Sequence, residues 1–240
     1  YNVVDSVFVS RISENAFNAV GLAFPLQSLM IAVGAGTAVG INALLSRSLG
    51  EKKQEMADRA AGAGIFLSLC SAVVFALIGI FLSRPFFMAQ AKTVPEIVEM
   101  GTAYTRICLG LSVGLFCQFC FERLLQSTGR TTLAMFTQLI GAITNIVLDP
   151  ILIFGLHMGV SGAALATVLS QAVSAIWILC FLLGKKTNLK LRLANMKLVP
   201  SVIGPCLALG ISSFVMVSTE SILSISFTSS LARFGGDVAV

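Results

Sequence analysis

Long apolar segments alternate with short polar or charged segments along the whole chain. Residues 15–46, 60–83, 131–148, 150–184 and 198–219 contain no Asp, Glu, Lys or Arg. A helix that crosses a lipid bilayer needs roughly 20 predominantly apolar residues. The pattern therefore predicts an all-α fold, that of a polytopic membrane protein.

Seven membrane spans are predicted from these segments. They cover residues 1–10, 16–46, 60–83, 96–126, 132–154, 161–183 and 201–231. Residues 47–59 are expected to form a charged loop, and Arg84 and Pro85 to open the next loop. We expect residues 1–184 to form a six-helix lobe whose first helix is truncated. Residues 185–200 then form a basic cytoplasmic linker, and residues 201–240 the first helix of a second lobe, so the chain is read as a piece of a longer protein.

Composition supports this class and excludes others. The chain is 56% hydrophobic and 11% charged, with a mean hydropathy of +0.93, whereas a soluble domain carries about 25% charged residues. A soluble enzyme, a nucleic-acid-binding module and a disordered chain are excluded. Most of the 16 Lys and Arg residues lie in the loops that follow the second, fourth and sixth spans. By the positive-inside rule, these loops and the N-terminus are expected on the cytoplasmic side of the plasma membrane.

Ionisable residues inside the predicted spans are the main candidates for chemistry, because a charge in lipid is costly and usually functional. The four acidic candidates are Asp5, Glu122, Asp149 and Glu220. For Glu122 we favour a structural interpretation, an interfacial ion pair with the adjacent Arg123. Asp5 and Asp149 are the favoured ion or proton sites. Their alternative role is a hydrogen bond that only ties helices together.

A polar stripe leads to Asp149 along one face of the fifth span. Asn145 lies one helical turn before Asp149, and Gln138 extends the same face by seven residues. Pro150 cannot donate a backbone hydrogen bond, so the helix is expected to bend or loosen there. A carboxylate beside such a break predicts an ion or proton site.

Neutral polar residues in other spans predict a cavity. Thr167 and Gln171 share one face of the sixth span, and Gln27 lies within the second. Gln27, Gln138 and Gln171 are candidate substrate-cavity residues, with simple helix packing as the alternative. Cys117 and Cys120 have CxxC spacing, but without a second pair or a nearby histidine they are interpreted as packing residues, and no metal site is expected.

A weak internal repeat relates the first and seventh spans. Asp5, Ser6 and Val7 align with Glu220, Ser221 and Ile222. Six spans separate the two copies, so both run in the same direction, as in transporters built by parallel duplication.

Several segments resemble the multidrug and toxic compound extrusion (MATE) transporters. These segments are VDSVFV (4–9), AVGLAFP (19–25), GAGTAVGINALLSRSLGEKK (34–53), RLLQSTGRTTLAM (123–135), NIVLDPILIFG (145–155) and GVSGAALATVLSQ (159–171). The resemblance implies twelve spans in two pseudo-symmetric lobes, of which this chain is the first lobe plus helix seven. It also implies a cation site formed by Tyr1, Asp5, Asn145, Asp149 and Thr167. Glu220 matches an acidic residue found in the second lobe of some sodium-coupled members.

The function implied is cation-coupled antiport, driven by protons or sodium, that exports amphipathic and often cationic organic compounds by alternating access. No cofactor beyond the coupling ion and no nucleic-acid partner are expected. The expected partners are small organic substrates, membrane lipid and the second lobe.

Three alternatives stay open. A related exporter or flippase of lipid-linked precursors would need a cationic cavity to hold phosphate. A non-transporting fragment is the second alternative. An intramembrane enzyme is the third, although the chain has a single histidine and no lysine within a span.

Overall fold

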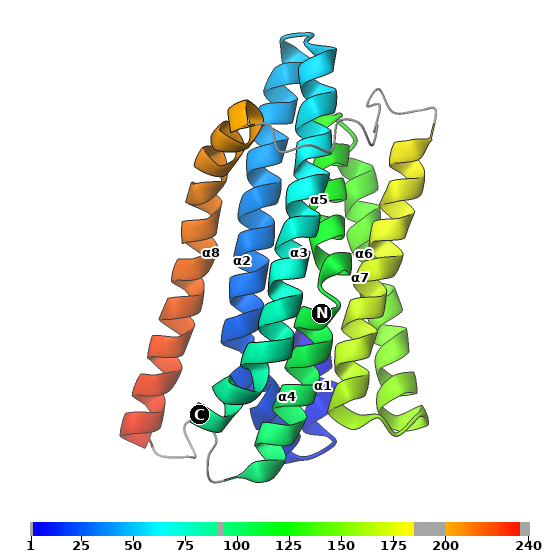
Figure 1. The fold of residues 1–240 in the computed structure, drawn as a ribbon. Coiled ribbons are helices and arrows are strands. Elements are labelled where there is room, and N and C mark those ends of the chain that lie inside the picture. Colours follow the sequence, from blue (N-terminus) through cyan, green and yellow to red (C-terminus); the bar gives the residue numbers. More distant parts are fainter. Residues whose placement is uncertain (1, 91–93, 185–199, 236–240) are drawn as a thin grey trace.

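The structure, a computed structural model, describes residues 2–90, 94–184 and 200–235, and within these ranges the chain is a bundle of helices without a strand (Figure 1). The elements are α1 (Asn2–Ser10), α2 (Glu14–Gly50), α3 (Gln54–Gln90), α4 (Pro95–Gly110), α5 (Val113–Ser127), α6 (Thr131–Pro150), the π-helix η1 (Ile151–Gly155), α7 (Gly159–Leu183) and α8 (Pro200–Gly235). The all-α prediction is confirmed.

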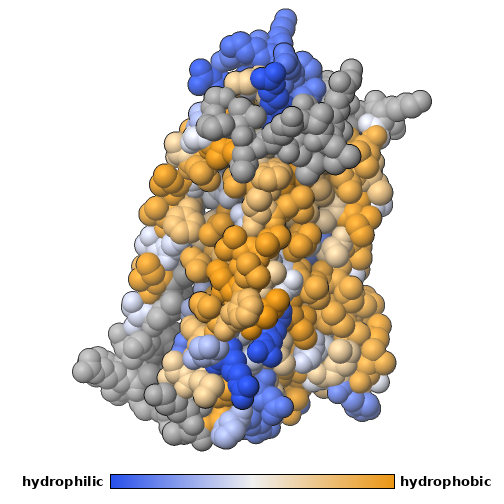
Figure 2. Space-filling view, viewed as in Figure 1, coloured by the Kyte–Doolittle hydropathy of each residue, from blue (hydrophilic) through white to orange (hydrophobic). Residues whose placement is uncertain are grey.

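The surface of the bundle is that of a membrane protein. Five helices in the described part of the chain are long and apolar enough to cross a membrane, and the bent pair α4 and α5 makes a sixth candidate span. Figure 2 shows a broad apolar band across the middle of the face that it draws, with hydrophilic residues gathered at the two ends. Lipid chains require such a band, because they cannot solvate polar side chains.

The connections divide between the two ends of the bundle as the span order predicts. Figure 1 shows the α2–α3 connection, the α5–α6 turn and the end of α7 at one end, and the α1–α2 and α6–α7 connections at the other. At the α2–α3 connection, Glu51 pairs with Lys53 (Nζ to Oε2, 2.7 Å) and Arg47 (Nε to Oε1, 2.9 Å). Hydrogen bonds from Lys53, which has the larger effect, and from Arg47 lower the pKa of Glu51 to about 2. Which end faces the cytoplasm stays a prediction.

Two predicted boundaries are wrong. The charged segment 47–59 is mostly helical, because α2 continues to Gly50 and α3 begins at Gln54. A helix can continue beyond the lipid, so charged residues need not lie in a loop. Glu55 and Arg59, one turn apart, form an ion pair at the start of α3 (Nη2 to Oε1, 2.7 Å). Pro85 lies inside α3 rather than in a loop, although a proline within a helix removes one hydrogen bond and crowds the preceding turn.

The fourth predicted span, residues 96–126, is not one continuous helix. It divides into α4 and α5, whose axes are bent by 42° at residues 111–112. At the break, the Ser112 hydroxyl donates to the carbonyl of Ala72 in α3 (3.3 Å). Just beyond it, Gly114 lies close to α7, where an added Cβ would sit 3.2 Å from the Ala172 nitrogen. The bend therefore directs the start of α5 against α7.

The loosening predicted at Pro150 is present. The regular α-helix ends at Pro150 and continues as the wider π-helix η1. The amide of Leu156 donates to the carbonyl of Ile151, five residues earlier (2.9 Å), which is the π-helical pattern. His157 follows with a positive φ of 54° and turns the chain toward α7.

Small residues bring α2 and α8 close together. Gly36 and Gly40 lie one turn apart on α2, opposite Cys206 and Gly210 on α8. A Cβ on Gly40 would collide with the Cys206 carbonyl oxygen, and one on Gly210 with the Gly36 carbonyl oxygen. Figure 1 shows α8 beside the upper part of α2 and apart from it lower down. Close backbone contact through small residues is typical of membrane helices.

Candidate functional site

Two carboxyl groups from distant parts of the sequence meet inside the bundle. Asp5 in α1 is 2% exposed and Asp149 at the end of α6 is 0% exposed. Their side chains lie close enough to act on each other electrostatically. Two carboxylates at close range repel each other, which disfavours the state in which both are ionised. A proton or a cation that reaches the pair is therefore bound favourably.

Neutral side chains complete the surroundings of this carboxyl pair. Asn145 Nδ2 donates to Asp149 Oδ1 (3.4 Å), as the one-turn spacing predicts. The Thr167 hydroxyl in α7 lies 2.9 Å from Asp5 Oδ2 and 3.1 Å from the Ala163 carbonyl oxygen. The structure thus brings together four of the five residues predicted for the cation site. The fifth, Tyr1, lies outside the described residues.

Three buried oxygens of this cluster lack a hydrogen-bond partner among the described residues. They are Asp5 Oδ1, Asn145 Oδ1 and Asp149 Oδ2. A buried acceptor without a donor costs roughly 1–3 kcal/mol, and more when it is charged. A proton or a small cation held between these oxygens would supply the missing partner. Within the described part of the chain, no group of three or more His, Cys, Asp or Glu residues forms a metal site.

Helix packing positions Thr167 opposite the carboxyl pair. Gly162 lets α7 approach η1 so closely that an added Cβ would lie 2.8 Å from the carbonyl carbon of Leu152. Thr167 follows on α7, and its side chain is largely buried beside α1. The Gly-x-x-Gly-Ala-Ala segment therefore sets the distance between α7 and the end of α6.

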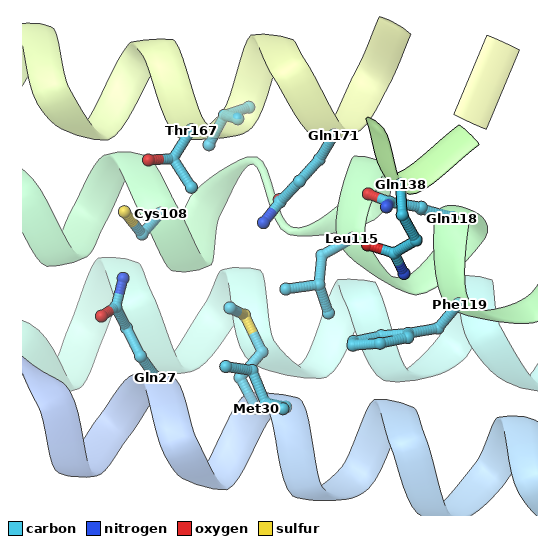
Figure 3. A pocket seen from close by; sticks show the side chains of 11 residues that line it. Gln27, Met30, Cys108, Leu115, Gln118, Phe119, Gln138, Thr167 and Gln171 are labelled. Carbon is cyan, nitrogen blue, oxygen red and sulfur yellow. The ribbon is translucent and has the colours of Figure 1, made fainter. Parts of the chain in front are cut away.

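A cavity of about 140 Å³ adjoins the carboxyl cluster. It lies between α2, α4, α5, α6 and α7, and it is lined by Gln27, Met30, Ile31, Cys108, Leu115, Gln118, Phe119, Gln138, Thr167, Val168 and Gln171. Figure 3 shows Gln118 and Gln138 toward one end of the cavity, Gln27, Cys108 and Thr167 toward the other, and Gln171 between them. The wall combines amide groups with apolar surface, and no Lys or Arg of the described residues lines it.

Thr167 connects the cavity to the carboxyl cluster, and a second polar contact lies at the same end of the cavity. Thr167 both lines the cavity and donates toward Asp5. Gln27 Nε2 donates to the hydroxyl of Tyr104 (3.1 Å), which is buried beside Cys108. The three glutamines predicted for a cavity, Gln27, Gln138 and Gln171, all line this one.

One predicted acid lies elsewhere. Glu220 is exposed on α8 and does not line the cavity. Figure 1 shows α1 and α8 running toward the same end of the bundle, as the parallel repeat requires. Asp5 reaches its neighbours because α1 packs against α6 and α7.

The predicted ion pair between Glu122 and Arg123 is wrong. Glu122 instead accepts hydrogen bonds from Gln138 Nε2 (2.7 Å) and Gln126 Nε2 (3.3 Å). Arg123 donates to Gln126 Oε1 (2.9 Å). Adjacent residues on a helix point in directions about 100° apart, so neighbours in sequence do not face each other.

Sequence reasoning missed two of the polar residues in this region, Gln118 and Tyr104. A signal for Gln118 was available, since Gln118, Glu122 and Gln126 recur every four residues and so share one face of α5. Tyr104 carried no comparable signal, because a tyrosine in an apolar helix is usually a packing residue.

Comparison with known proteins shows the family to which this chain belongs. The family model MatE matches residues 1–151. The multidrug export protein MepA of Staphylococcus haemolyticus is 26% identical over 239 residues, which cover 98% of this chain and 52% of that protein. The Probable multidrug resistance protein YoeA of Bacillus subtilis is 26% identical over 223 residues, which cover 89% of this chain and 48% of that protein. The chain therefore spans about half the length of the curated relatives it matches.

Solved structures agree with the family model. An inward-facing multidrug resistance MATE family transporter of the MOP superfamily matches with a TM-score of 0.90 and 29% identity, over 98% of this chain and 54% of that one. An outward-facing structure of such a transporter also gives a TM-score of 0.90, with 30% identity over 99% of this chain and 52% of that one. By its helices, by the family model and by these structures, the chain is a multi-pass membrane protein that belongs to the MatE family, the MATE transporters.

Proposed function

We propose that this chain is the first half of a cation-coupled antiporter that exports amphipathic, often cationic organic compounds. The observation that carries the proposal is the buried Asp5–Asp149 pair, joined through Thr167 to a cavity lined with amide and apolar groups. The names of the relatives, a multidrug export protein and a multidrug resistance protein, support the direction of transport and the class of cargo.

The proposed full-length transporter extends beyond the chain. In it, residues 1–184 form the first lobe, residues 185–200 a cytoplasmic linker, and residues 201–240 belong to the second lobe. The transporter is placed in the plasma membrane, and its N-terminus in the cytoplasm, because the basic α2–α3 and α5–α6 connections share one end of the bundle. The half-length match to the relatives supports this arrangement.

Coupling is proposed to occur at the carboxyl pair. Two like charges in close contact within a low-dielectric interior repel each other strongly. Uptake of one proton, or binding of one sodium ion between the unpartnered oxygens, removes this repulsion. The cluster thus has two states that differ in charge, which is the requirement for an ion gradient to drive a conformational cycle.

Thr167 is proposed to report the charge state of Asp5 to the cavity. Its hydroxyl carries one hydrogen but has two acceptors in reach, Asp5 Oδ2 and the Ala163 carbonyl. An ionised carboxylate is the stronger acceptor, so the hydroxyl donates to Asp5 when that group is charged. When Asp5 is neutral, the hydroxyl turns to Ala163, and the polarity of the cavity wall changes.

Alternating access is proposed to move this lobe as a unit. The chain matches an inward-facing and an outward-facing MATE family structure with the same TM-score of 0.90. The lobe fold is therefore compatible with both conformations, which supports a cycle in which lobes reorient rather than refold.

The alternatives are less well supported. A transporter of lipid-linked precursors needs positive charge to hold phosphate, whereas the described cavity is lined without Lys or Arg and lies beside two acids. The relatives are transporters by name and not enzymes, so the intramembrane-enzyme interpretation is dropped.

Dye efflux tests the proposal. Cells that express the full-length transporter are loaded with ethidium, and efflux is followed while a protonophore or a sodium ionophore collapses one gradient at a time. We expect efflux to stop with one of the two ionophores and to continue with the other. Efflux that persists when both gradients are absent, or no efflux at all at normal membrane levels, would refute cation-coupled export.

A further inference from the structure

A second buried carboxylate, separate from the Asp5–Asp149 pair, lies behind the cavity wall and contacts Gln138, which lines the cavity. Glu122 in α5 is 6% exposed. Its two oxygens accept hydrogen bonds from two neutral amides, those of Gln138 in α6 (2.7 Å) and Gln126 (3.3 Å). Coupling at the Asp5–Asp149 pair makes no use of this group.

Glu122 forms no ion pair with a described Lys or Arg, although the charge of Arg123 acts on it from a distance. The ion pairs within the described residues join Arg47 and Lys53 to Glu51, and Arg59 to Glu55. Arg123, next to Glu122 in sequence, donates instead to Gln126 (2.9 Å). A buried carboxylate without a paired positive charge is costly, even when amides donate to it. The site therefore gains stability from any cation that reaches it.

The amide of Gln138 links Glu122 to the cavity. Gln138 lines the cavity and donates its nitrogen to Glu122. Because the nitrogen faces Glu122, the negative carbonyl end of this amide is left for a ligand. Gln118, one turn before Glu122 on the same face of α5, also lines the cavity, and Figure 3 shows Gln118 and Gln138 together at one end.

The rest of the cavity wall suits an apolar body attached to a charge. Met30, Leu115 and Phe119 line it alongside the glutamines. Methionine and phenylalanine offer polarisable, adaptable contact surface to organic groups of different shape. No described Lys or Arg lines the wall to repel a cation.

We propose that Glu122, acting with Gln138, forms a recognition site for the charged group of organic cations at the end of the cavity nearest the 127–130 turn. The inference rests on the proposed export function and adds a residue that selects cargo by charge. Glu122 attracts the cation, Gln138 presents its carbonyl to it, and the apolar wall receives the remainder of the molecule. Asp5 and Asp149 stay free to bind the coupling ion.

The test compares a cation with a neutral molecule of similar size and shape. Binding of tetraphenylphosphonium and of triphenylphosphine oxide is measured on the purified full-length transporter and on its Glu122→Gln variant. We expect Glu122→Gln to weaken tetraphenylphosphonium binding roughly tenfold to a hundredfold, the effect of losing a charged partner. Binding of triphenylphosphine oxide should stay within about twofold, because a neutral molecule gains little from one more charge.

Matched variants separate charge recognition from structural damage. Glu96→Gln, which removes an exposed carboxylate bonded to Asn15, should leave both affinities unchanged. Gln138→Lys keeps Glu122 but supplies it with an internal cation, so it should abolish selective binding of tetraphenylphosphonium. If Glu122→Gln does not fold, the Gln138→Lys variant decides the question.

The outcomes distinguish this inference from the proposed function. If the wild type exports ethidium, while Glu122→Gln or Gln138→Lys binds tetraphenylphosphonium as tightly as the wild type, the role of Glu122 is refuted and the export function stands. Equal weakening for the cation and the neutral molecule refutes charge recognition as well. If the wild type neither binds tetraphenylphosphonium nor exports ethidium, the proposed function itself fails.

Discussion

The contact between α2 and α8 should not tolerate a side chain at Gly40. A Cβ there would collide with the carbonyl oxygen of Cys206, and a backbone atom cannot rotate away as a flexible side chain can. The two helices must separate, as they cannot repack around the added atoms. Overpacking of this kind costs typically about 1–3 kcal/mol. Because about 1.4 kcal/mol is a tenfold change in an equilibrium, Gly40→Val should increase the separated form roughly 5- to 150-fold.

A matched control lies in the same helix. Gly21 is exposed on α2, and a Cβ built there meets no atom of the described structure within 4 Å. Gly21→Val makes the same chemical change with the same helix propensity, but without the collision. It should leave the α2–α8 contact unchanged, so any difference between the two variants measures packing against α8.

Maleimide labelling of Cys206 reports the contact directly. Cys206 is 3% exposed where α8 packs against α2. For the assay, the other cysteines of the full-length transporter are replaced by alanine. We expect N-ethylmaleimide to label Cys206 faster in Gly40→Val than in Gly21→Val, whose rate should equal that of the wild type. Equal labelling rates in both variants, with equal melting temperatures, would show that the close approach of α2 and α8 is not required.

Four further predictions concern coupling, the surface charges and orientation. Asp149→Asn should insert and fold normally but lose gradient-driven ethidium efflux, because it keeps the shape and removes the titrating group; normal efflux at matched membrane levels would exclude it from coupling. Thr167→Ser should keep efflux and Thr167→Val should lose it, and equal rates would contradict a role for the hydroxyl. Since the pKa of Glu51 is lowered to about 2 from 4.5, its small contribution to stability is present above pH 4.5 and is lost as the pH falls toward 2. The melting-temperature difference between wild type and Glu51→Gln should therefore be constant from pH 8 to 5 and vanish near pH 2. Cysteines placed at Lys52 and His157 should react with impermeant reagents from the cytoplasmic and the external side respectively, and the reverse pattern would overturn the proposed orientation.

The sequence by itself determined the features that depend on local periodicity. The charge-free runs predict membrane helices because lipid rejects charge over a length of about 20 residues. The four-residue spacing of Asn145 and Asp149 predicts a shared face, and the two side chains are hydrogen-bonded in the structure. The weakness of the helix at Pro150 follows from its missing amide hydrogen, and the chain does widen into η1 there.

Local patterns gave wrong predictions where a charged residue or a proline can lie either in a loop or within a helix. The charged residues near Glu51 suggested a long loop, although helices can extend beyond the lipid and end there. Pro85 suggested a loop but is accommodated within α3. The break at residues 111–112 was invisible, because Leu111 and Ser112 include neither a charge nor a proline and the bend depends on contacts with α3 and α7.

Only the tertiary structure decided which polar groups meet. Thr167 reaches Asp5 across 162 positions, and Gln138 reaches Glu122 across a turn between two helices. These contacts depend on how closely the helix axes approach, which is set by glycines such as Gly162 and Gly114 against backbone atoms of a neighbouring element. Helical periodicity fixes the face on which a side chain lies, but the neighbour opposite that face is chosen by packing between helices, and so the partner of Glu122 could be found only in three dimensions.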